Sequence, residues 1–207
     1  MFIDTQNLYH SAKNLYGAKV NFGQVLKEAV AGRNLIRAIA YVITTESGDE
    51  KGFFEALEKF GIETKTKDLQ IFYGGAKKAD WDVGLAIDAV KLAPKLDTVI
   101  IASGDGDFIP LVEYLKNNEG FQVEVIAFGK SASGKLKEIA DDFVDLSDDP
   151  KRFIMGYNAR RMSRGPYRGS AGTTNGKAEP ENGAVAPAPP ATEPVVPIVA
   201  TDDEHSY

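Results

Sequence analysis

The sequence predicts an α/β fold with a mostly parallel central β-sheet flanked by helices, followed by a disordered C-terminal tail. Three observations lead to this prediction. Short β-branched segments alternate with segments of helical periodicity between residues 1 and 146. Residues 98–102 are apolar or β-branched throughout, which is typical of a strand buried on both faces. Glycine, proline, alanine, serine and threonine dominate residues 157–207, where large apolar side chains are rare.

The expected elements follow one another in strand–helix order. Asn21 followed by Gln24 is close to a capping box, and Gly61 and Pro94 are typical helix terminators. Residues 62–67 alternate charged with neutral side chains, as an exposed edge strand does. We expect strands at residues 1–4, 35–43, 62–67, 98–102, 122–128 and 142–146, with residues 70–73 continuing or pairing with the edge strand. We expect helices from Leu8 onward and at residues 21–32, 53–60, 80–93, 108–115 and 131–140.

Acidic residues follow two of these strands directly. Asp4 ends the first strand, and Asp105 and Asp107 follow residues 98–102 in a Ser-Gly-Asp-Gly-Asp sequence. The carboxyl ends of parallel strands are where ligands bind in open α/β sheets. Carboxylates at such a position suit Mg²⁺ or Mn²⁺, which take hard oxygen ligands. The alternative interpretation, which applies to Asn7 as well, is that these residues are turn residues and helix N-caps.

The expected helix at residues 80–93 carries further acids. Asp80 is expected to be its N-cap, and Asp82 lies in the first turn on a stripe of small alanines that permits close packing. A separate apolar face is formed by Val83, Ala86, Ile87 and Val90. Asp88 lies about 240° around the helix from Asp82, so we interpret it as a structural acid. Lys77 and Lys78 precede the helix and are either solvated charges or contacts for a phosphate.

The composition excludes several classes of site. The 207 residues contain no cysteine, which rules out disulfides, thiolate zinc sites and a cysteine nucleophile. A Ser-His-Asp triad would depend on His10, because the second histidine, His205, lies in the tail. No segment has the length of a transmembrane helix and the chain opens without a signal-peptide pattern, so we expect a cytoplasmic protein with no membrane partner. The net charge of −6 argues mildly against a general nucleic-acid binder but is compatible with acids that hold a metal.

We expect one folded domain at residues 1–156 and a disordered tail at residues 157–207. The start of the tail carries four arginines and no acid, with tyrosine and glycine between them: Arg160, Arg161, Arg164 and Arg168. Such a segment suits single-stranded nucleic acid through charge and stacking. A plain solubilising tail is the alternative, and the two interpretations are equally open.

Three segments together resemble one family. Residues 2–9 (FIDTQNLY), 80–89 (DWDVGLAIDA) and 97–108 (DTVIIASGDGDF) resemble the NYN domain, a branch of the PIN-like nuclease superfamily that includes LabA-like bacterial proteins. The resemblance covers residues 1–148, and Thr5 stands where the family usually has glycine. It implies a three-layer α/β sandwich whose acids at the strand ends bind Mg²⁺ or Mn²⁺ and cleave RNA.

Matched motif by motif, the resemblance assigns the metal to Asp4, Asp82 and Asp105. It assigns catalysis to the same three acids together with Asp107. Asn7 matches the polar residue that supports the site.

The function we expect is that of a metal-dependent endoribonuclease, which hydrolyses RNA phosphodiesters with metal-activated water and uses Mg²⁺ or Mn²⁺ as cofactor. The expected RNA contacts are Lys77, Lys78, Arg160 and Arg161. Single-stranded RNA is the expected partner, and a homo-oligomer or a regulatory protein partner stays open.

The alternative is a non-catalytic RNA-binding or regulatory module on the same fold. A sugar-nucleotide enzyme with a DxD motif fits less well, because Asp4 has no role in it. A phosphatase also fits less well, because Gln6 stands where an aspartyl-phosphate mechanism often has a second acid.

Overall fold

The computed structural model describes residues 1–44, 51–68, 70–71, 77–78 and 80–157. At its centre lies a six-stranded sheet in the order β3-β2-β1-β6-β7-β8, in which all neighbouring strands are parallel. Its strands are β1 (Phe2–Asp4), β2 (Ile39–Thr44), β3 (Glu63–Asp68), β6 (Thr98–Ala102), β7 (Gln122–Ala127) and β8 (Asp142–Asp145). A separate antiparallel pair is formed by β4 (Gln70–Ile71) and β5 (Lys77–Lys78). The predicted α/β class with a mostly parallel sheet is confirmed.

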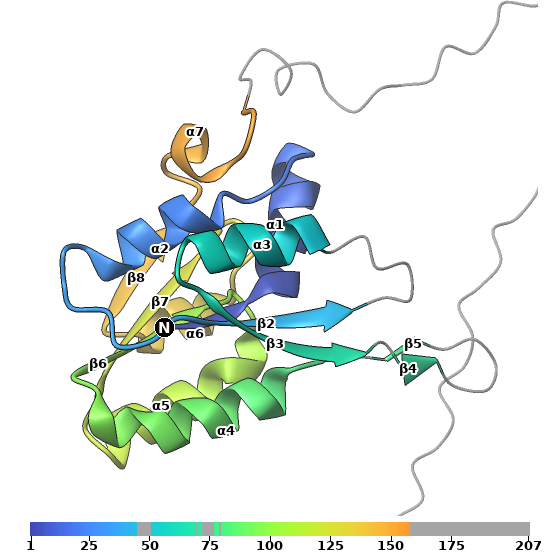
Figure 1. The fold of residues 1–207 in the computed structure, drawn as a ribbon. Coiled ribbons are helices and arrows are strands. Elements are labelled where there is room, and N and C mark those ends of the chain that lie inside the picture. Colours follow the sequence, from blue (N-terminus) through green and yellow to red (C-terminus); the bar gives the residue numbers. More distant parts are fainter. Residues whose placement is uncertain (45–50, 69, 72–76, 79, 158–207) are drawn as a thin grey trace, which may run out of the picture. The chain divides into compact units, whose positions relative to one another are not determined.

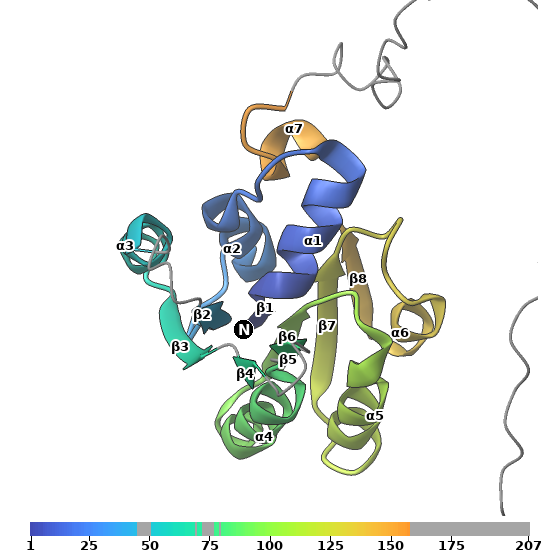
Figure 2. The same cartoon turned by 90° about the vertical axis from the view of Figure 1, so that its right-hand side faces the viewer.

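Helices cover both faces of the sheet, which gives three layers (Figures 1 and 2). One face carries α1 (Thr5–Tyr16), α2 (Phe22–Val30), α3 (Lys51–Lys59) and the short α7 (Pro150–Phe153). The other face carries α4 (Asp82–Leu92), α5 (Ile109–Asn117) and α6 (Gly134–Ile139). Two 3₁₀ turns, η1 (Ala93–Lys95) and η2 (Gly106–Phe108), complete the elements of the described residues. No helix in this part of the chain has the length and apolar character needed to cross a membrane.

The order of the strands places a crevice between β1 and β6. From β1 the chain moves outward through β2 to the edge strand β3, and it then returns to β6 on the other side of β1 and moves outward again through β7 and β8. Phe2 of β1 therefore pairs with Ile39 on one side and with Ile101 on the other. Helices leave β1 and β6 toward opposite faces, and ligands bind at such a switch point in open α/β sheets.

Alternate residues of the central strands supply two separate cores. Ile3 packs into the core under α1, α2 and α3, whereas its neighbour Phe2 packs into the core under α4, α5 and α6. In β6, Ile100 and Ala102 belong to the first core and Val99 and Ile101 to the second. The expectation that this strand is buried on both faces is confirmed, because its last four residues are all buried.

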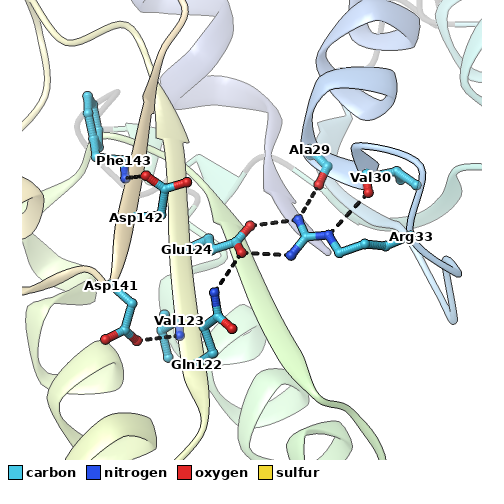
Figure 3. Close-up of polar contacts among 9 residues, drawn as sticks. All are labelled: Ala29, Val30, Arg33, Gln122, Val123, Glu124, Asp141, Asp142 and Phe143. Carbon is cyan, nitrogen blue, oxygen red and sulfur yellow. Dashed lines mark hydrogen bonds and ion pairs between the residues drawn. The ribbon is translucent and has the colours of Figure 1, made fainter.

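A charged pair fastens the segment after α2 to β7 (Figure 3). The Arg33 guanidinium donates two hydrogen bonds of 2.7 Å to the Glu124 carboxylate, which is 8% exposed. Arg33 also donates to the carbonyl oxygens of Ala29 and Val30 at the end of α2. The fork of the guanidinium thus caps the helix and neutralises an acid inside the sheet at the same time.

Several local expectations are corrected by the structure. Asp80 does not cap α4: the N-cap residue is Trp81, which makes no side-chain capping bond. Residues 70–71 pair with β5 instead of the edge strand, and residues 72–73 lie outside the described residues. β2 begins at Ile39 instead of residue 35, and α7 was not expected.

The apolar face of α4 does not pack on the sheet. Val83, Ile87 and Val90 are exposed, and the helix contacts the core through Leu85 and Ala89 instead. The expected close packing of the alanine stripe is seen instead, because Ala89 and Ala93 are buried and Ala86 packs against the same core.

Candidate acidic active site

The acids predicted from three separate segments meet at the crevice between β1 and β6. Asp4 is the last residue of β1, Asp105 follows β6, and Asp82 is the first residue of α4. All three line one cleft of about 320 Å³. The described residues that line it are Asp4, Gln6, Asn7, His10, Ser11, Asn14, Tyr41, Asp80, Trp81, Asp82, Asp105 and Ser131.

Asp4 is held by hydrogen bonds to both of its carboxylate oxygens. Oδ1 accepts from the backbone N–H of Asn7 at 3.0 Å, so Asp4 is indeed the N-cap of α1. Oδ2 accepts from the hydroxyl of Ser103 at 3.0 Å. The structural and the functional interpretation of Asp4 are therefore compatible, because the cap fixes the carboxylate at the rim of the cleft.

Asn7 joins the two motifs to each other. Its side-chain Oδ1 accepts from the backbone N–H of Gly104 at 2.9 Å, so Asn7 is a link between α1 and the loop after β6 instead of a helix cap. A Cβ at Gly104 would lie 2.9 Å from Ala132 Cα, closer than real side chains approach. Glycine is needed here because the loop packs directly against a neighbouring backbone.

Asp105 and Asp107 have different surroundings. The backbone N–H of Asp105 donates to Ser103 Oγ at 3.2 Å, and its carboxylate accepts from the N–H of Asp107 at 3.0 Å. Asp107 itself is exposed and lines the neighbouring groove between α4 and α5, outside the cleft. The structure thus brings Asp4, Asp82 and Asp105 together and sets Asp107 at the edge of the group.

Asp82 is positioned by the aromatic residue before it, Trp81. The indole N–H of Trp81 donates to the carbonyl oxygen of Val42 in β2 at 3.1 Å, and the ring packs edge-on against Tyr41 at 5.4 Å between centroids. This anchor holds the start of α4 against the sheet, so the first-turn carboxylate of Asp82 faces the cleft. Asp80 lines the same cleft although the sequence suggested only a capping role for it.

Burial and like charge raise the pKa of two acids in the cleft. Burial is the main reason that the pKa of Asp4 lies above its ordinary value. The pKa of Asp82 is raised from 3.8 to about 6, first by burial and then by repulsion from Asp4, Asp105, Asp80 and Asp107. A divalent cation would offset this repulsion, and carboxylate oxygens are the ligands that Mg²⁺ and Mn²⁺ prefer.

The donor chemistry of the cleft therefore fits a divalent cation. Within the described residues, however, no group of three or more acids or histidines is arranged so that it could hold an ion. Mg²⁺ commonly binds through one or two carboxylates together with water and substrate phosphates. The assignment of a single shared ion to Asp4, Asp82 and Asp105 stays a prediction.

Asp88 lies outside this group and is fixed by two other residues. Its Oδ2 accepts from the Tyr41 hydroxyl at 2.7 Å and from Lys65 Nζ at 2.6 Å. Burial acts to raise the pKa of Asp88, but these two hydrogen bonds outweigh it and leave the pKa below its ordinary value. The interpretation of Asp88 as a structural acid is consistent with these contacts.

The structure does not describe the side chains of the predicted RNA contacts. Lys77 and Lys78 form β5, but the positions of their side chains are not described. Arg160 and Arg161 lie beyond the described residues. Their roles remain predictions.

Four further polar residues were missed or given little weight by sequence reasoning: Gln6, His10 and Asn14 line the cleft, and Ser103 donates a hydrogen bond to Asp4. Asn7, His10 and Asn14 are spaced three and four residues apart, which places them on one face of a helix. This spacing could have identified the α1 wall of the cleft. Ser103 stands between β6 and Gly104, and only the contact with Asp4 shows that it bridges the two acids.

Comparison with known proteins identifies relatives of this chain. The sequence profile of the NYN domain matches residues 1–147. The low amplitude and bright protein LabA of Synechococcus elongatus is 27% identical over 120 residues, which cover 55% of this chain. The match spans 64% of that protein, less than two thirds of its length.

A solved structure with the same fold comes from Vibrio parahaemolyticus. It is the protein VPA0982, whose function is unknown, and it is 32% identical to this chain with a TM-score of 0.68. The likeness covers 74% of this chain and 93% of the Vibrio protein. The three-layer arrangement is thus shared with an independently solved relative.

Proposed function

The chain belongs to the NYN domain family, and we propose that it is a metal-dependent endoribonuclease that hydrolyses RNA phosphodiesters. Membership of this nuclease family supports a ribonuclease-type function. The observation that carries the finer proposal is the cleft at the β1–β6 switch point, where Asp4, Asp82 and Asp105 approach from three segments.

The residues of the cleft have separate roles in this proposal. The Asp4 carboxylate accepts from the Ser103 hydroxyl, to which the backbone N–H of Asp105 donates. The carboxylates of Asp4 and Asp105 would hold Mg²⁺ or Mn²⁺, and Asp82 would complete the negative charge around the ion. Asn7 keeps the loop after β6 against α1 through its bond to Gly104. When bound, such an ion lowers the pKa of water and stabilises negative charge on the phosphoryl group.

The substrate we propose is single-stranded RNA. Lys77, Lys78, Arg160 and Arg161 are its proposed phosphate contacts, since cations are needed to bring a phosphodiester toward an acidic cleft. Asp107, at the edge of the acid group, contributes electrostatically to cleavage. A cytoplasmic location also belongs to this proposal.

Cleavage of RNA by the purified full chain tests the proposal. Mixed single-stranded and structured RNA is incubated with Mn²⁺, with Mg²⁺ or with EDTA, and we expect cleavage only with an ion. Asp105→Asn keeps the shape of the side chain but removes its charge, so cleavage should fall by about a thousandfold or more. RNA affinity should stay within a few fold, because a carboxylate by itself does not attract phosphate.

Asp97→Asn is the matched control. Asp97 is an exposed acid that lines a cavity around residues 33–37 and 95–98, outside the acidic cleft, so its replacement should leave cleavage unchanged. If the wild type cleaves no RNA with either ion, or if Asp105→Asn cleaves as fast as the wild type, the nuclease proposal fails. RNA binding without cleavage would then favour a non-catalytic RNA-binding or regulatory module.

A further inference from the structure

Helix α4 has a second apolar face that the fold leaves uncovered. Leu85 and Ala89 on its first face are fully buried against the sheet. On its second face Val83, Ile87 and Val90 are 69%, 46% and 37% exposed. A helix that is apolar on more than one side is usually buried on more than one side, so this face is suited to a partner.

The exposed face forms one wall of a groove between α4 and α5. The groove has a volume of about 750 Å³, and Tyr114 of α5, which is 38% exposed, lies on its other wall. Eight large apolar side chains are exposed among the described residues, and four of them line this single groove. Such clustering marks an interaction surface, whereas scattered exposed apolar residues do not.

The chemistry of the groove favours protein over RNA. Its exposed apolar residues on α4 are branched aliphatic side chains, which offer no π-face for a base. One end of the groove carries Asp80, Asp82 and Asp107, which repel phosphate, and among the described residues Lys91 is the one lysine or arginine in its lining. An aliphatic stripe beside unlike charges is typical of helix–helix contacts between proteins.

The charges along the groove are complementary to those of a second copy in the antiparallel orientation. The acids lie at the amino-terminal end of α4, and Lys91 lies at its carboxyl-terminal end. Val83, Ile87 and Val90 are spaced four and three residues apart, about 10 Å from end to end. Two such helices crossing antiparallel would place Ile87 against Ile87 and the acids of each copy beside Lys91 of the other.

From this complementarity we infer that the groove between α4 and α5 is a homodimer interface related by a two-fold axis. The side chains of Val83, Ile87 and Val90 in each copy cover the same side chains in the other copy, as an isologous contact requires. Each copy also places its Lys91 beside Asp80 and Asp82, at the edge of the other copy's acidic cleft. The inference does not rest on the proposed nuclease activity, so either proposal can fail without the other.

Sedimentation velocity of the full chain over a concentration series tests the inference. We expect the wild type to sediment with twice the 22.4 kDa mass of one chain. Ile87→Glu should weaken the dimer roughly a hundredfold or more, because it buries two facing charges at the two-fold axis. Lys91→Glu should weaken it about tenfold or more, and adding Asp80→Lys to the same chain should restore it.

Ile36→Glu is the control, because Ile36 is a similarly exposed apolar residue that does not line the groove. Circular dichroism and thermal melting of each variant establish that it is folded. A monomeric wild type overturns the inference, and so does an Ile87→Glu variant that stays dimeric. If Ile87→Glu lowers RNA affinity without changing the mass, the groove is an RNA subsite and the inference is also overturned.

Discussion

Among the single residues, Asp82 combines partial burial with several like-charged neighbours. Its pKa in the folded protein is about 6, whereas the ordinary value is 3.8. The folded state therefore holds the proton more tightly than the unfolded chain between these values. Without a bound ion, the contribution of Asp82 to the free energy of unfolding should fall as the pH rises from about 4 to about 6, and it should then level off.

We expect Asp82→Asn to remove this pH dependence. In EDTA at pH 7 the variant should be more stable than the wild type by about 1 kcal/mol, an amount reduced from the full pKa shift because Asp82 is partly open to solvent. At a pH below the ordinary value of 3.8 the two proteins should be equally stable, since the wild-type carboxyl is then also neutral. Urea unfolding over a pH series measures both effects, and an equal gain at every pH would contradict this explanation.

Thr5 shows how the chain tolerates a departure from its family. It is the first residue of α1 and is buried, and its hydroxyl donates to the carbonyl oxygen of Tyr41 at 2.6 Å. The only non-glycine residue with positive φ in the described part of the chain is Ala31, so Thr5 does not strain the backbone beside Asp4. Its side chain instead fastens α1 to β2.

We expect Thr5→Gly, which introduces the residue that the resemblance to the family implies at this position, to lower the free energy of unfolding by about 1–2 kcal/mol. A buried hydrogen bond and part of the helix propensity are lost together. Thr5→Ser keeps the hydroxyl and should lose less than half as much. Denaturant unfolding of the two variants makes the comparison, and a Thr5→Gly variant as stable as the wild type would show that the bond to Tyr41 contributes nothing.

Among the elements, the position of α4 depends on a glycine in its first turn. A Cβ at Gly84 would lie 2.5 Å from the Trp81 ring, and that ring is fixed by its bond to Val42. Glycine normally weakens a helix, but here it leaves space for the side chain that anchors the helix. The same contact sets the direction of Asp82.

We expect Gly84→Ala to destabilise the protein by about 1–3 kcal/mol, although alanine is the better helix former, because the ring has to move. Gly52→Ala in α3 is the matched control. Nothing lies within 4 Å of its new Cβ, so it should stabilise the protein by about 0.5 kcal/mol. Thermal unfolding compares the two variants, and a stabilised Gly84→Ala variant would show that Trp81 does not need this space.

On the scale of the whole molecule, the described residues form two hydrophobic cores, one on each face of the sheet. Among the described residues, these cores draw on helices of both faces and on every strand of the central sheet except β3. The composition of residues 157–207 predicts that they are disordered. Stability and RNA binding should therefore depend on different parts of the chain.

We expect truncation after Tyr157 to leave the melting temperature unchanged within a degree or so while weakening RNA binding. The slope of log affinity against log salt should decrease by about 3, because four arginines no longer contact phosphates. Replacing Arg160, Arg161, Arg164 and Arg168 by glutamine in the full chain should reproduce this change. Fluorescence anisotropy with single-stranded RNA measures the slope, and an unchanged slope would make the tail a spacer.

Much of this architecture could be predicted from the local sequence. Residues 98–102 specified a strand buried on both faces because every side chain in them is apolar or β-branched. Asp4 and Asp105 could be placed at strand ends because Asp4 ends the first predicted strand and only Ser103 and Gly104 separate Asp105 from residues 98–102. Parallel strands align their carboxyl ends, so these two acids had to lie at the same edge of the sheet if their strands were parallel.

Only the tertiary structure decided which acids meet and which face of α4 is free. The adjacency of β1 and β6 depends on strand order, and with it the Ser103 bridge between Asp4 and Asp105. The rotation of α4 is set by Trp81, whose partner Val42 lies 39 residues earlier in the chain. Periodicity in the sequence indicates that a helix has apolar faces. Which of these faces packs inward depends on contacts between residues far apart in the sequence, and these contacts exist only once the chain has folded.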